Sequence, residues 1–162
     1  MNAQVKIVYR ISDEEWDRTA RLRWDEEAFP LYHCFFGLVS FRAQDEEVLG
    51  TDHFDMSIAD LAVGLAELLS ELHSGADGVL RFQQSDDMLE ILFHIDGERV
   101  GITHNLKTGR SWDCRRSDLA TAITDFVGAF ANEATTKVPS LLDWRDMGVL
   151  GDFITRQTSP PS

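Results

Sequence analysis

Regular alternation of apolar and polar residues marks the middle of the chain. Residues 89–95 carry an apolar side chain at every second position, as in a strand with one buried face. Asp96-Gly97 follows, a dipeptide that favours a two-residue hairpin turn because both residues tolerate positive φ. Shorter alternating segments lie on either side, at 80–82 and 100–102. The pattern predicts a three-stranded antiparallel meander.

Two other segments have apolar residues at the three- and four-residue spacing of an amphipathic helix. The first begins after Ser57, an N-cap candidate, and stops before Gly75, a residue typical of a helix C-cap. The second begins near Arg116 or Ser117. The apolar stripes are Ile58, Leu61, Ala62, Leu65, Leu68, Leu69 and Leu72 in the first helix, and Leu119, Ile123, Phe126, Val127 and Phe130 in the second.

The residues at the start of the two helices match each other at a constant offset. Phe54-Asp55-Met56 aligns with Trp112-Asp113-Cys114, and Asp60-Leu61-Ala62 aligns with Asp118-Leu119-Ala120. Each block is typical of a strand end that runs into a helix. One interpretation is two strand-strand-helix halves; the other is convergence, because an acid in the first turn is common in helices.

The first third of the chain is partly ambiguous. Residues 5–11 alternate and predict a strand. Ser12 and Glu15 have the spacing of a capping box, which favours a short helix through Trp16. Residues 19–24 also alternate and fit a strand with one polar face, so the structure of residues 12–30 stays open.

The aromatic and β-branched segment 31–41 has apolar residues on both faces and predicts a central strand that is covered on both sides. A turn at 45–47 and a short strand at 48–56 follow. Near the end, Thr135, Thr136 and Pro139 are expected to break the second helix, and Ser140 to begin a last helix or two short pieces.

These elements predict an α+β protein with one antiparallel sheet of about five or six strands and two long helices on one face. We expect a single domain over residues 1–157 and a disordered tail at 158–162 that contains two prolines. No segment approaches the ~20 apolar residues of a membrane span. With no signal peptide visible, we expect a cytoplasmic protein whose Cys34 and Cys114 are buried free thiols.

The chain is strongly acidic. It has 162 residues with 28 acidic and 15 basic side chains, a formal net charge of −13. Such a surface repels phosphate groups, which argues against nucleic-acid binding and against adhesion to anionic membranes, and it attracts basic proteins. The acids cluster in turns that flank the predicted central strand and would emerge at its opposite ends. The candidate partner-binding residues are Asp25, Glu26, Glu27, Asp45, Glu46 and Glu47, although clusters of this kind also serve simply to solvate turns.

The sequence contains no motif that is typical of a catalytic, metal-binding or phosphate-binding site. A metal site at His94, Asp96 and His104 would require the three side chains to converge on one point. Asp96, however, is expected in a turn, which argues against such a site. No Gly-x-Ser-x-Gly elbow and no phosphate-binding glycine loop occurs. We therefore expect neither an enzyme nor a protein with a metal or cofactor. Four tryptophans could serve as interaction hot spots, but the core is the more usual place for each.

In overall character the chain resembles the immunity proteins of bacterial polymorphic toxin systems. The likeness rests on its small size, its acidity and the order of strands, helix, meander and helix, and no residue role is carried over. The resemblance implies a cytosolic protein that covers the active site of a toxin, often a basic nuclease. Two alternatives are a homo-oligomeric structural protein, with a homodimer as the simplest case, and a ligand-binding or hydrolase domain. The latter would need a pocket in which an acid meets His33, His53, His94 or His104.

Overall fold

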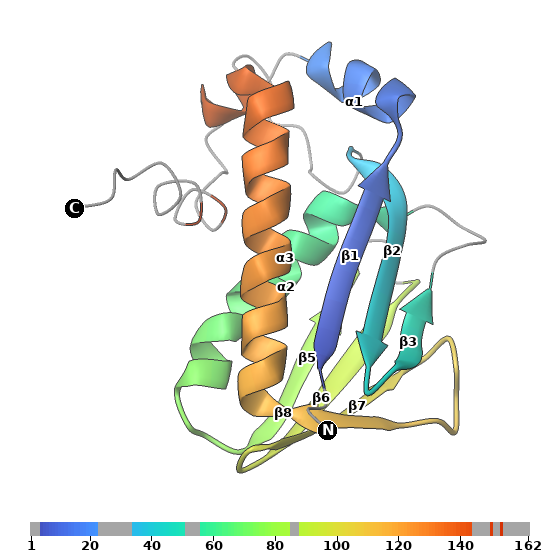
Figure 1. Cartoon of the computed structure of the whole chain (residues 1–162), viewed down its shortest axis with the longest axis vertical. Helices are drawn as coiled ribbons and strands as arrows, with labels where there is room; N and C mark the ends of the chain where they lie inside the picture. The colour runs from blue at the N-terminus through green and yellow to red at the C-terminus, as the bar shows by residue number, and fades with distance from the viewer. Residues whose placement is uncertain are drawn as a thin grey trace.

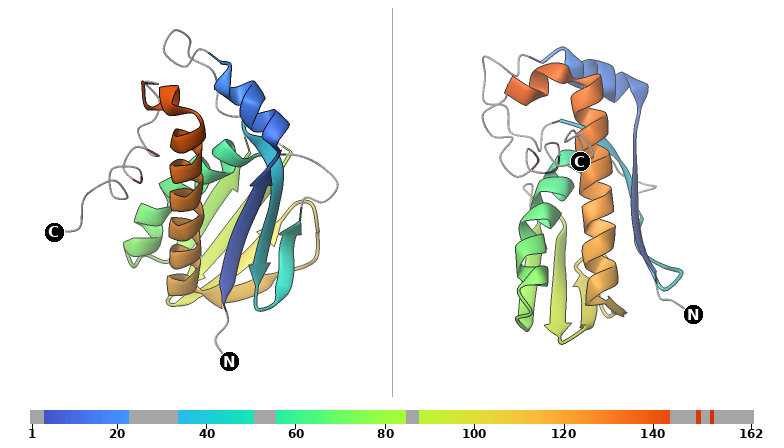
Figure 2. Two further views of the ribbon diagram at one scale, coloured as in Figure 1. Left: turned by 45° about the horizontal axis from the view of Figure 1, so that its top comes forward. Right: turned by 60° about the vertical axis from the view of Figure 1, so that its left-hand side comes forward.

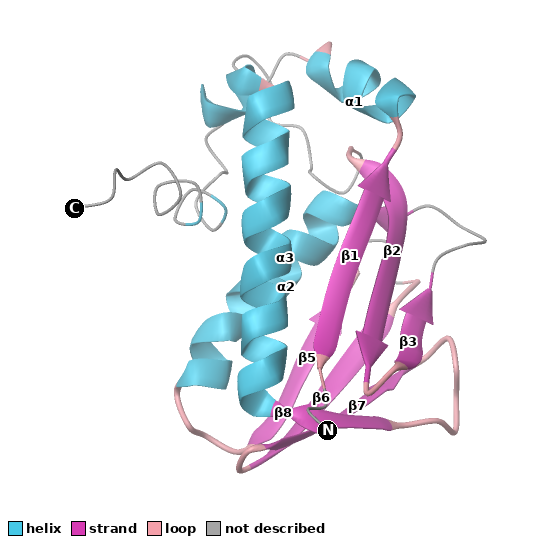
Figure 3. Ribbon diagram, viewed as in Figure 1, coloured by secondary structure: helices cyan, strands magenta, loops and turns pink. Residues whose placement is uncertain are grey.

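The computed structural model describes residues 4–22, 34–50, 56–84 and 88–143, together with Leu150 and Phe153. Over these residues the chain is α+β, which confirms the predicted class (Figures 1 and 3). The strands are β1 Val5–Ile11, β2 Phe36–Ala43, β3 Glu46–Gly50, β4 Met56–Ser57, β5 Gly78–Gln83, β6 Glu90–Asp96, β7 Arg99–His104 and β8 Trp112–Arg115. The helices are α1 Asp13–Ala20, α2 Ile58–His73, α3 Arg116–Lys137 and the 3-10 helix η2 Pro139–Asp143.

The strands form two antiparallel sheets, whereas the sequence predicted one. The first sheet has the order β1-β2-β3, with β4 also paired to β2, and the second has the order β5-β6-β7-β8. The two long helices pack against each other, and each contacts a strand of each sheet: α2 contacts β2 and β5, and α3 contacts β1 and β8. The apolar surface of the helix pair is therefore divided between two sheets. A single sheet on one face of the pair could not cover both parts of that surface.

In the first sheet, β2 is central, as predicted, but only one of its faces is buried. Val39, Phe41 and Ala43 face the core, while Phe36 and Leu38 on the other face are partly exposed. The expected coverage of both faces is therefore wrong over the described residues. The strand predicted at 48–56 is divided into β3 and β4, and residues 51–55 lie outside the described part.

The second sheet contains the predicted meander as β5, β6 and β7, and β8 extends it. Ile91, Phe93 and Ile95 of β6 are buried, as their alternation predicts. The hairpin turn lies one residue later than predicted, at Gly97 and Glu98, because Asp96 still pairs with Arg99 in the ladder. Gly97 has φ 60 and stands at the first central position, which is where a type II′ turn needs glycine.

Both long helices begin directly after the last strand of a sheet. α2 follows β4, and α3 follows β8, so the two matched sequence blocks occupy equivalent places in the fold. Ser57 caps α2 by accepting a hydrogen bond from the backbone N–H of Asp60 at 3.2 Å. Gly75, just after the end of α2, has φ 82, which confirms the predicted glycine C-cap.

α1 confirms the predicted helix and its N-cap, because Ser12 Oγ accepts from the Glu15 N–H at 3.2 Å; the Glu15 carboxylate, which a capping box would direct back to Ser12, accepts instead from the Phe36 N–H and Arg18. The alternative strand is wrong for residues 19 and 20, which are helical, and residues 23–33 lie outside the described part. The predicted break of the second helix lies at Pro139 and not at the two threonines, since α3 continues through Thr135 and Thr136 to Lys137 and the 3-10 helix η2 begins at Pro139. Both threonine hydroxyls donate to carbonyls within α3, so the helix accommodates them.

Within the described ranges, no helix combines the length and the apolar character that a membrane crossing requires. The predicted domain end at residue 157 and the tail at 158–162 lie outside the described residues.

Candidate functional site

The predicted acidic residues are only partly within the described structure. Asp25, Glu26 and Glu27 lie outside it. Asp45, Glu46 and Glu47 are exposed at the tip of the β2–β3 hairpin, where Gln44 and Asp45 adopt the positive φ of a tight turn. Arg42 and Arg110 lie close to this tip.

Arg42 Nη2 donates to the Asp45 carbonyl at 2.6 Å, and Arg110 Nη2 forms an ion pair with Glu46 Oε2 at 3.1 Å. The hairpin tip therefore carries less negative charge than its sequence suggests.

A larger feature is the groove between β1 and α3, with a volume of ≈ 700 Å³. α3 runs alongside β1, and the left view of Figure 2 shows it on the side of β1 away from β2. All of β1 lines one side of this β1–α3 groove. The other side is one face of α3, formed by Ala122, Asp125, Phe126, Ala129, Asn132 and Glu133.

The ladder between β1 and β2 determines which backbone groups face the groove. The N–H of Gln44 donates to the carbonyl of Gln4 at 3.3 Å, and the register continues from Val5↔Ala43 without a shift. Hydrogen-bonded and non-hydrogen-bonded pairs alternate along an antiparallel ladder. The backbone groups of Lys6, Val8 and Arg10 therefore bond to β2. Those of Val5, Ile7 and Tyr9 point away from β2, toward the groove.

Tyr9 fixes one end of the groove. Its hydroxyl lies 2.7 Å from Glu133 Oε1 and 3.3 Å from the Ala129 carbonyl. Its ring makes edge-on contacts with Phe126 and Phe130, both with centroids 5.8 Å away. Burial and the neighbouring Glu133 carboxylate raise the pKa of Tyr9 well above its usual value, so the phenol stays a neutral donor. This residue ties β1 to α3 and sets their separation.

The two sides of the groove differ in charge. On α3, Asp125 and Asn132 are exposed and Ala129 is a small exposed residue between them. On β1, Lys6 and Arg10 are exposed on the outer face of the sheet. The helix side of the groove is thus acidic with small side chains, and the outer face of the strand is basic.

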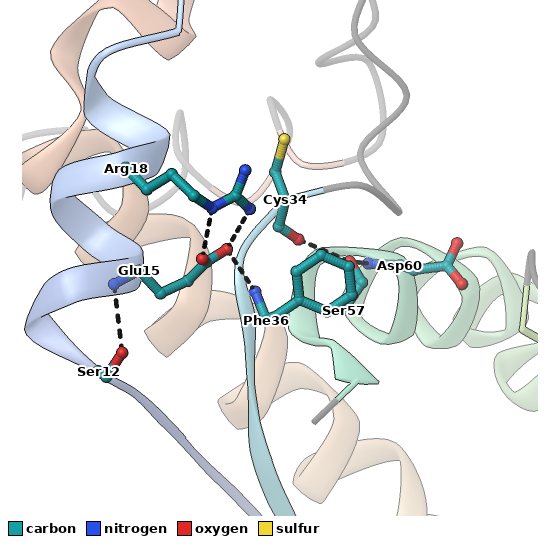
Figure 4. A network of polar contacts seen from close by, with 7 residues as sticks. All are labelled: Ser12, Glu15, Arg18, Cys34, Phe36, Ser57 and Asp60. Atoms are coloured by element: carbon teal, nitrogen blue, oxygen red, sulfur yellow. Dashed lines mark hydrogen bonds and ion pairs between the residues drawn. The ribbon is translucent and has the colours of Figure 1, made fainter. Parts of the chain in front are cut away.

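A second polar arrangement closes the upper end of the first sheet (Figure 4). β1 ends at Ile11, opposite Gly37, so the next N–H of β2 on that side, from Phe36, has no strand partner. Glu15 Oε2 accepts it at 2.9 Å, and Arg18 donates twice to the same carboxylate, at 2.6 and 2.7 Å. Burial alone would raise the pKa of Glu15, but these hydrogen bonds hold it below its ordinary value.

The hydroxyl of Ser57, close to the start of β2, also has a structural role. Ser57 Oγ donates to the Cys34 carbonyl at 2.9 Å and accepts from the backbone N–H of Asp60 (Figure 4). The hydroxyl is therefore occupied in capping α2 and holding the start of β2, not placed as a nucleophile.

The cysteines and histidines are dispersed over the described structure. Cys34 and Cys114 are buried free thiols, as predicted, and burial raises the pKa of Cys34 to about 11 and of Cys114 to about 12. His94 pairs with Gly101 on the outer face of the second sheet, whereas His104 pairs with Ile91 on the buried face. The two imidazoles cannot converge on one metal ion. His33 and His53 lie outside the described residues.

His104 is a neutral structural residue. Its Nε2 donates to the Val48 carbonyl at 2.6 Å, its Nδ1 accepts from the Leu106 N–H at 3.2 Å, and its ring stacks on Trp112. Nε2 must carry the proton because a carbonyl can only accept. Burial lowers the pKa of His104 below 6.5, an effect that the bond to Val48 opposes in part.

We expect the free energy of unfolding to fall as the pH drops below ~6.5, because the unfolded chain then binds a proton at His104 that the folded protein does not. The loss grows until the pH reaches the lowered folded-state pKa, and each pKa unit between the two states corresponds to ~1.4 kcal/mol. Urea unfolding at several pH values would measure this slope. His104→Gln should flatten it, and His94→Gln, on the exposed face, should not; equal slopes in all three proteins would contradict the assignment.

Comparisons with models of protein families, with curated proteins and with solved structures gave no match. Sequence reasoning missed the β1–α3 groove, although one signal was present. Asp125, Ala129 and Asn132 recur at helical spacing and make one side of α3 small or polar next to its apolar stripe.

Two of the four tryptophans are core residues. Trp16 and Trp112 are buried, Trp16 against the ring of Phe35 and Trp112 against His104. Trp24 and Trp144 lie outside the described part of the chain. The described tryptophans thus contribute to packing and are not surface anchors for a partner.

Proposed function

We propose that this protein binds a basic partner protein and acts by covering part of that partner's surface. The observation that carries the proposal is the distribution of charge in the folded chain. The sequence has a net charge of −13, and several of its few arginines pair within the chain, so carboxylates elsewhere on the surface have no basic neighbour. Arginines that bond to carboxylates or carbonyls within the protein are Arg18, Arg42, Arg81, Arg99, Arg110 and Arg116.

Exposed carboxylates remain on the helices, α1 and α3 among them. Asp13, Glu14 and Asp17 of α1 and Asp125 of α3 are exposed and have no ion-pair partner among the described residues. Carboxylates of this kind create a negative potential that extends about a Debye length, ~10 Å at 0.1 M salt. Such a field raises the association rate with a positively charged protein and disfavours acidic ones.

The action that fits this description is occlusion. Among the described residues there is no converging set of metal ligands, and the buried thiols and the capping Ser57 are poor nucleophiles. The resemblance to immunity proteins supports the same mode of action, in which the bound protein covers the active site of a toxin. For a basic nuclease, the acidic surface would occupy the place of the nucleic-acid phosphates.

Co-purification at two salt concentrations tests this function. The tagged protein would be recovered from its native cells at ~50 mM and at ~500 mM salt, where surface charges are strongly screened. We expect a basic protein that is retained at the low concentration and largely lost at the high one. A neutral or acidic partner retained equally at both would contradict the proposal. Recovery of the chain alone, at a multiple of its own mass, would favour the homo-oligomeric alternative.

A further inference from the structure

We propose that the β1–α3 groove receives an extended segment of the partner protein, which adds to β1 as a new edge strand. This inference deepens the proposed function, protein binding, and rests on it. It adds the place of contact, the backbone geometry and the side-chain chemistry of the segment that binds.

β1 lies at the edge of its sheet. β1 has seven residues and ends the sheet order, with β2 as its one strand neighbour in the described structure. Val5, Ile7 and Tyr9 direct their backbone N–H and C=O groups to the groove, as the ladder register requires. A row of such groups is a template for another strand, and an extended peptide that pairs with it gains main-chain hydrogen bonds.

The groove is long enough to hold an extended segment. Its volume of ≈ 700 Å³ lies along the whole of β1, a length of roughly 23 Å at ~3.3 Å per residue. Ala122 and Ala129 present only methyl groups to it from α3. Side chains of an added strand that point toward α3 can therefore lie beside these alanines, while Tyr9, which contacts Phe126 and the Ala129 carbonyl, limits the space near its own end of the groove.

The two faces of an added strand would meet different charges. Alternate residues of an added strand point to opposite faces. Those directed toward α3 meet Asp125 and Asn132, which favours lysine, arginine or a small residue. Those on the outer face lie beside Lys6, Val8 and Arg10, which favours an acidic or β-branched residue. The segment is thus one that alternates basic or small residues with acidic or β-branched ones.

A second copy of the chain fits this groove less well. Each copy has a net charge of −13, so two copies repel each other at low salt. In an antiparallel pairing of two β1 strands centred on Val8, Lys6 of one copy would lie opposite Arg10 of the other, and like charges that face each other destabilise a strand pair. A segment with the alternating pattern avoids both costs.

The test uses a phage-displayed library of random seven-residue peptides, selected on three proteins. These are the unmodified chain, Ala129→Trp, which fills the groove from an exposed position, and Thr121→Trp, a matched change at an exposed position of α3 outside it. We expect the unmodified chain and Thr121→Trp to enrich the same alternating peptides. Ala129→Trp should bind the best of these at least ~10-fold more weakly. A copy of that peptide with N-methyl groups on the residues that pair with β1 should lose binding to a similar extent.

Amide exchange of the chain with the best peptide bound gives the second readout. The N–H groups of Val5, Ile7 and Tyr9 should gain protection, while Lys6, Val8 and Arg10 should change little because they already bond to β2. No enrichment, equal binding to Ala129→Trp, or protection elsewhere would overturn the inference. So would a dimer of the free chain that Ala129→Trp converts to a monomer, because it would assign the groove to a second copy.

The two proposals can fail separately. If a basic protein co-purifies and Ala129→Trp retains it, the groove is wrong and the proposed function stands. If alternating peptides bind β1 and no basic protein co-purifies, the strand-addition site stands and the proposed partner is wrong.

Discussion

Replacing Arg116 by methionine is expected to lower the free energy of unfolding by about 3–5 kcal/mol. Arg116 is the first residue of α3 and is 7% exposed. Its guanidinium donates to four backbone carbonyls: Leu72 at 2.6 Å, Ala76 at 3.0 Å, Glu71 at 3.1 Å and Gly97 at 3.3 Å. These carbonyls come from the end of α2, the segment before β5 and the β6–β7 turn. One side chain therefore joins the start of α3 to the end of α2 and to the second sheet.

The size of the effect follows from what remains after the substitution. The last carbonyls of a helix have no partner within it. The guanidinium bonds to those of Leu72 and Glu71, the second of which also accepts from Ser74, and it complements the negative end of the α2 dipole. Methionine preserves much of the apolar stem but leaves the buried Leu72 carbonyl without this donor and removes a donor from three part-buried carbonyls, at ~1–3 kcal/mol for each that water cannot reach. Urea unfolding would measure the loss.

Arg115→Met is the matched control, because Arg115 is exposed and its side chain makes no capping hydrogen bond. We expect its effect to stay within ~0.5 kcal/mol. A loss below ~1 kcal/mol for Arg116→Met, or equal losses for the two variants, would show that Arg116 does not join α3 to the end of α2 and the second sheet.

Gly37→Ala is expected to destabilise the protein by about 2–3 kcal/mol and to disturb the pairing of β1 with β2. A Cβ at Gly37 would lie 2.3 Å from the Arg10 carbonyl oxygen and 3.0 Å from Cγ1 of Ile11. The nearer atom belongs to the backbone of the neighbouring strand, so the clash can be relieved only if the two strands separate.

Gly50→Ala gives the comparison, because it makes a contact of similar closeness with a different kind of neighbour. Its Cβ would lie 2.2 Å from a carboxylate oxygen of Glu47, the end of an exposed and flexible side chain that can rotate away. We expect this variant to lose less than ~1 kcal/mol. Thermal unfolding of the two variants would distinguish the cases, and equal losses would contradict the close approach of β1 and β2.

The local elements of this fold could be predicted from sequence, because their signals are local. Ser57 and Gly75 mark the ends of α2, Ser12 and Glu15 mark the start of α1, and the alternation at 89–95 marks β6. Several matched positions of the two repeated blocks lie in the core. In the matched pairs Met56 and Cys114, Leu61 and Leu119, and Leu65 and Ile123, every side chain is buried.

The non-local features could not be obtained in this way. Whether the strands join in one sheet or two depends on which apolar faces are covered, and strand periodicity is the same in both cases. Arg116 carries no sequence signal that separates it from the exposed Arg115. The β1–α3 groove likewise depends on the placement of a strand and a helix that are more than 100 residues apart in the chain.

Amide hydrogen exchange of the free protein tests the central claim, the open edge of β1, most directly. Residue-resolved rates would be measured by NMR along Val5–Ile11. The structure predicts an alternating pattern, with slow exchange at Lys6, Val8 and Arg10, which bond to β2, and fast exchange at Val5, Ile7 and Tyr9, which face the groove. Equal protection at all six amides would contradict it, since the edge would then already be covered and could not receive a partner strand.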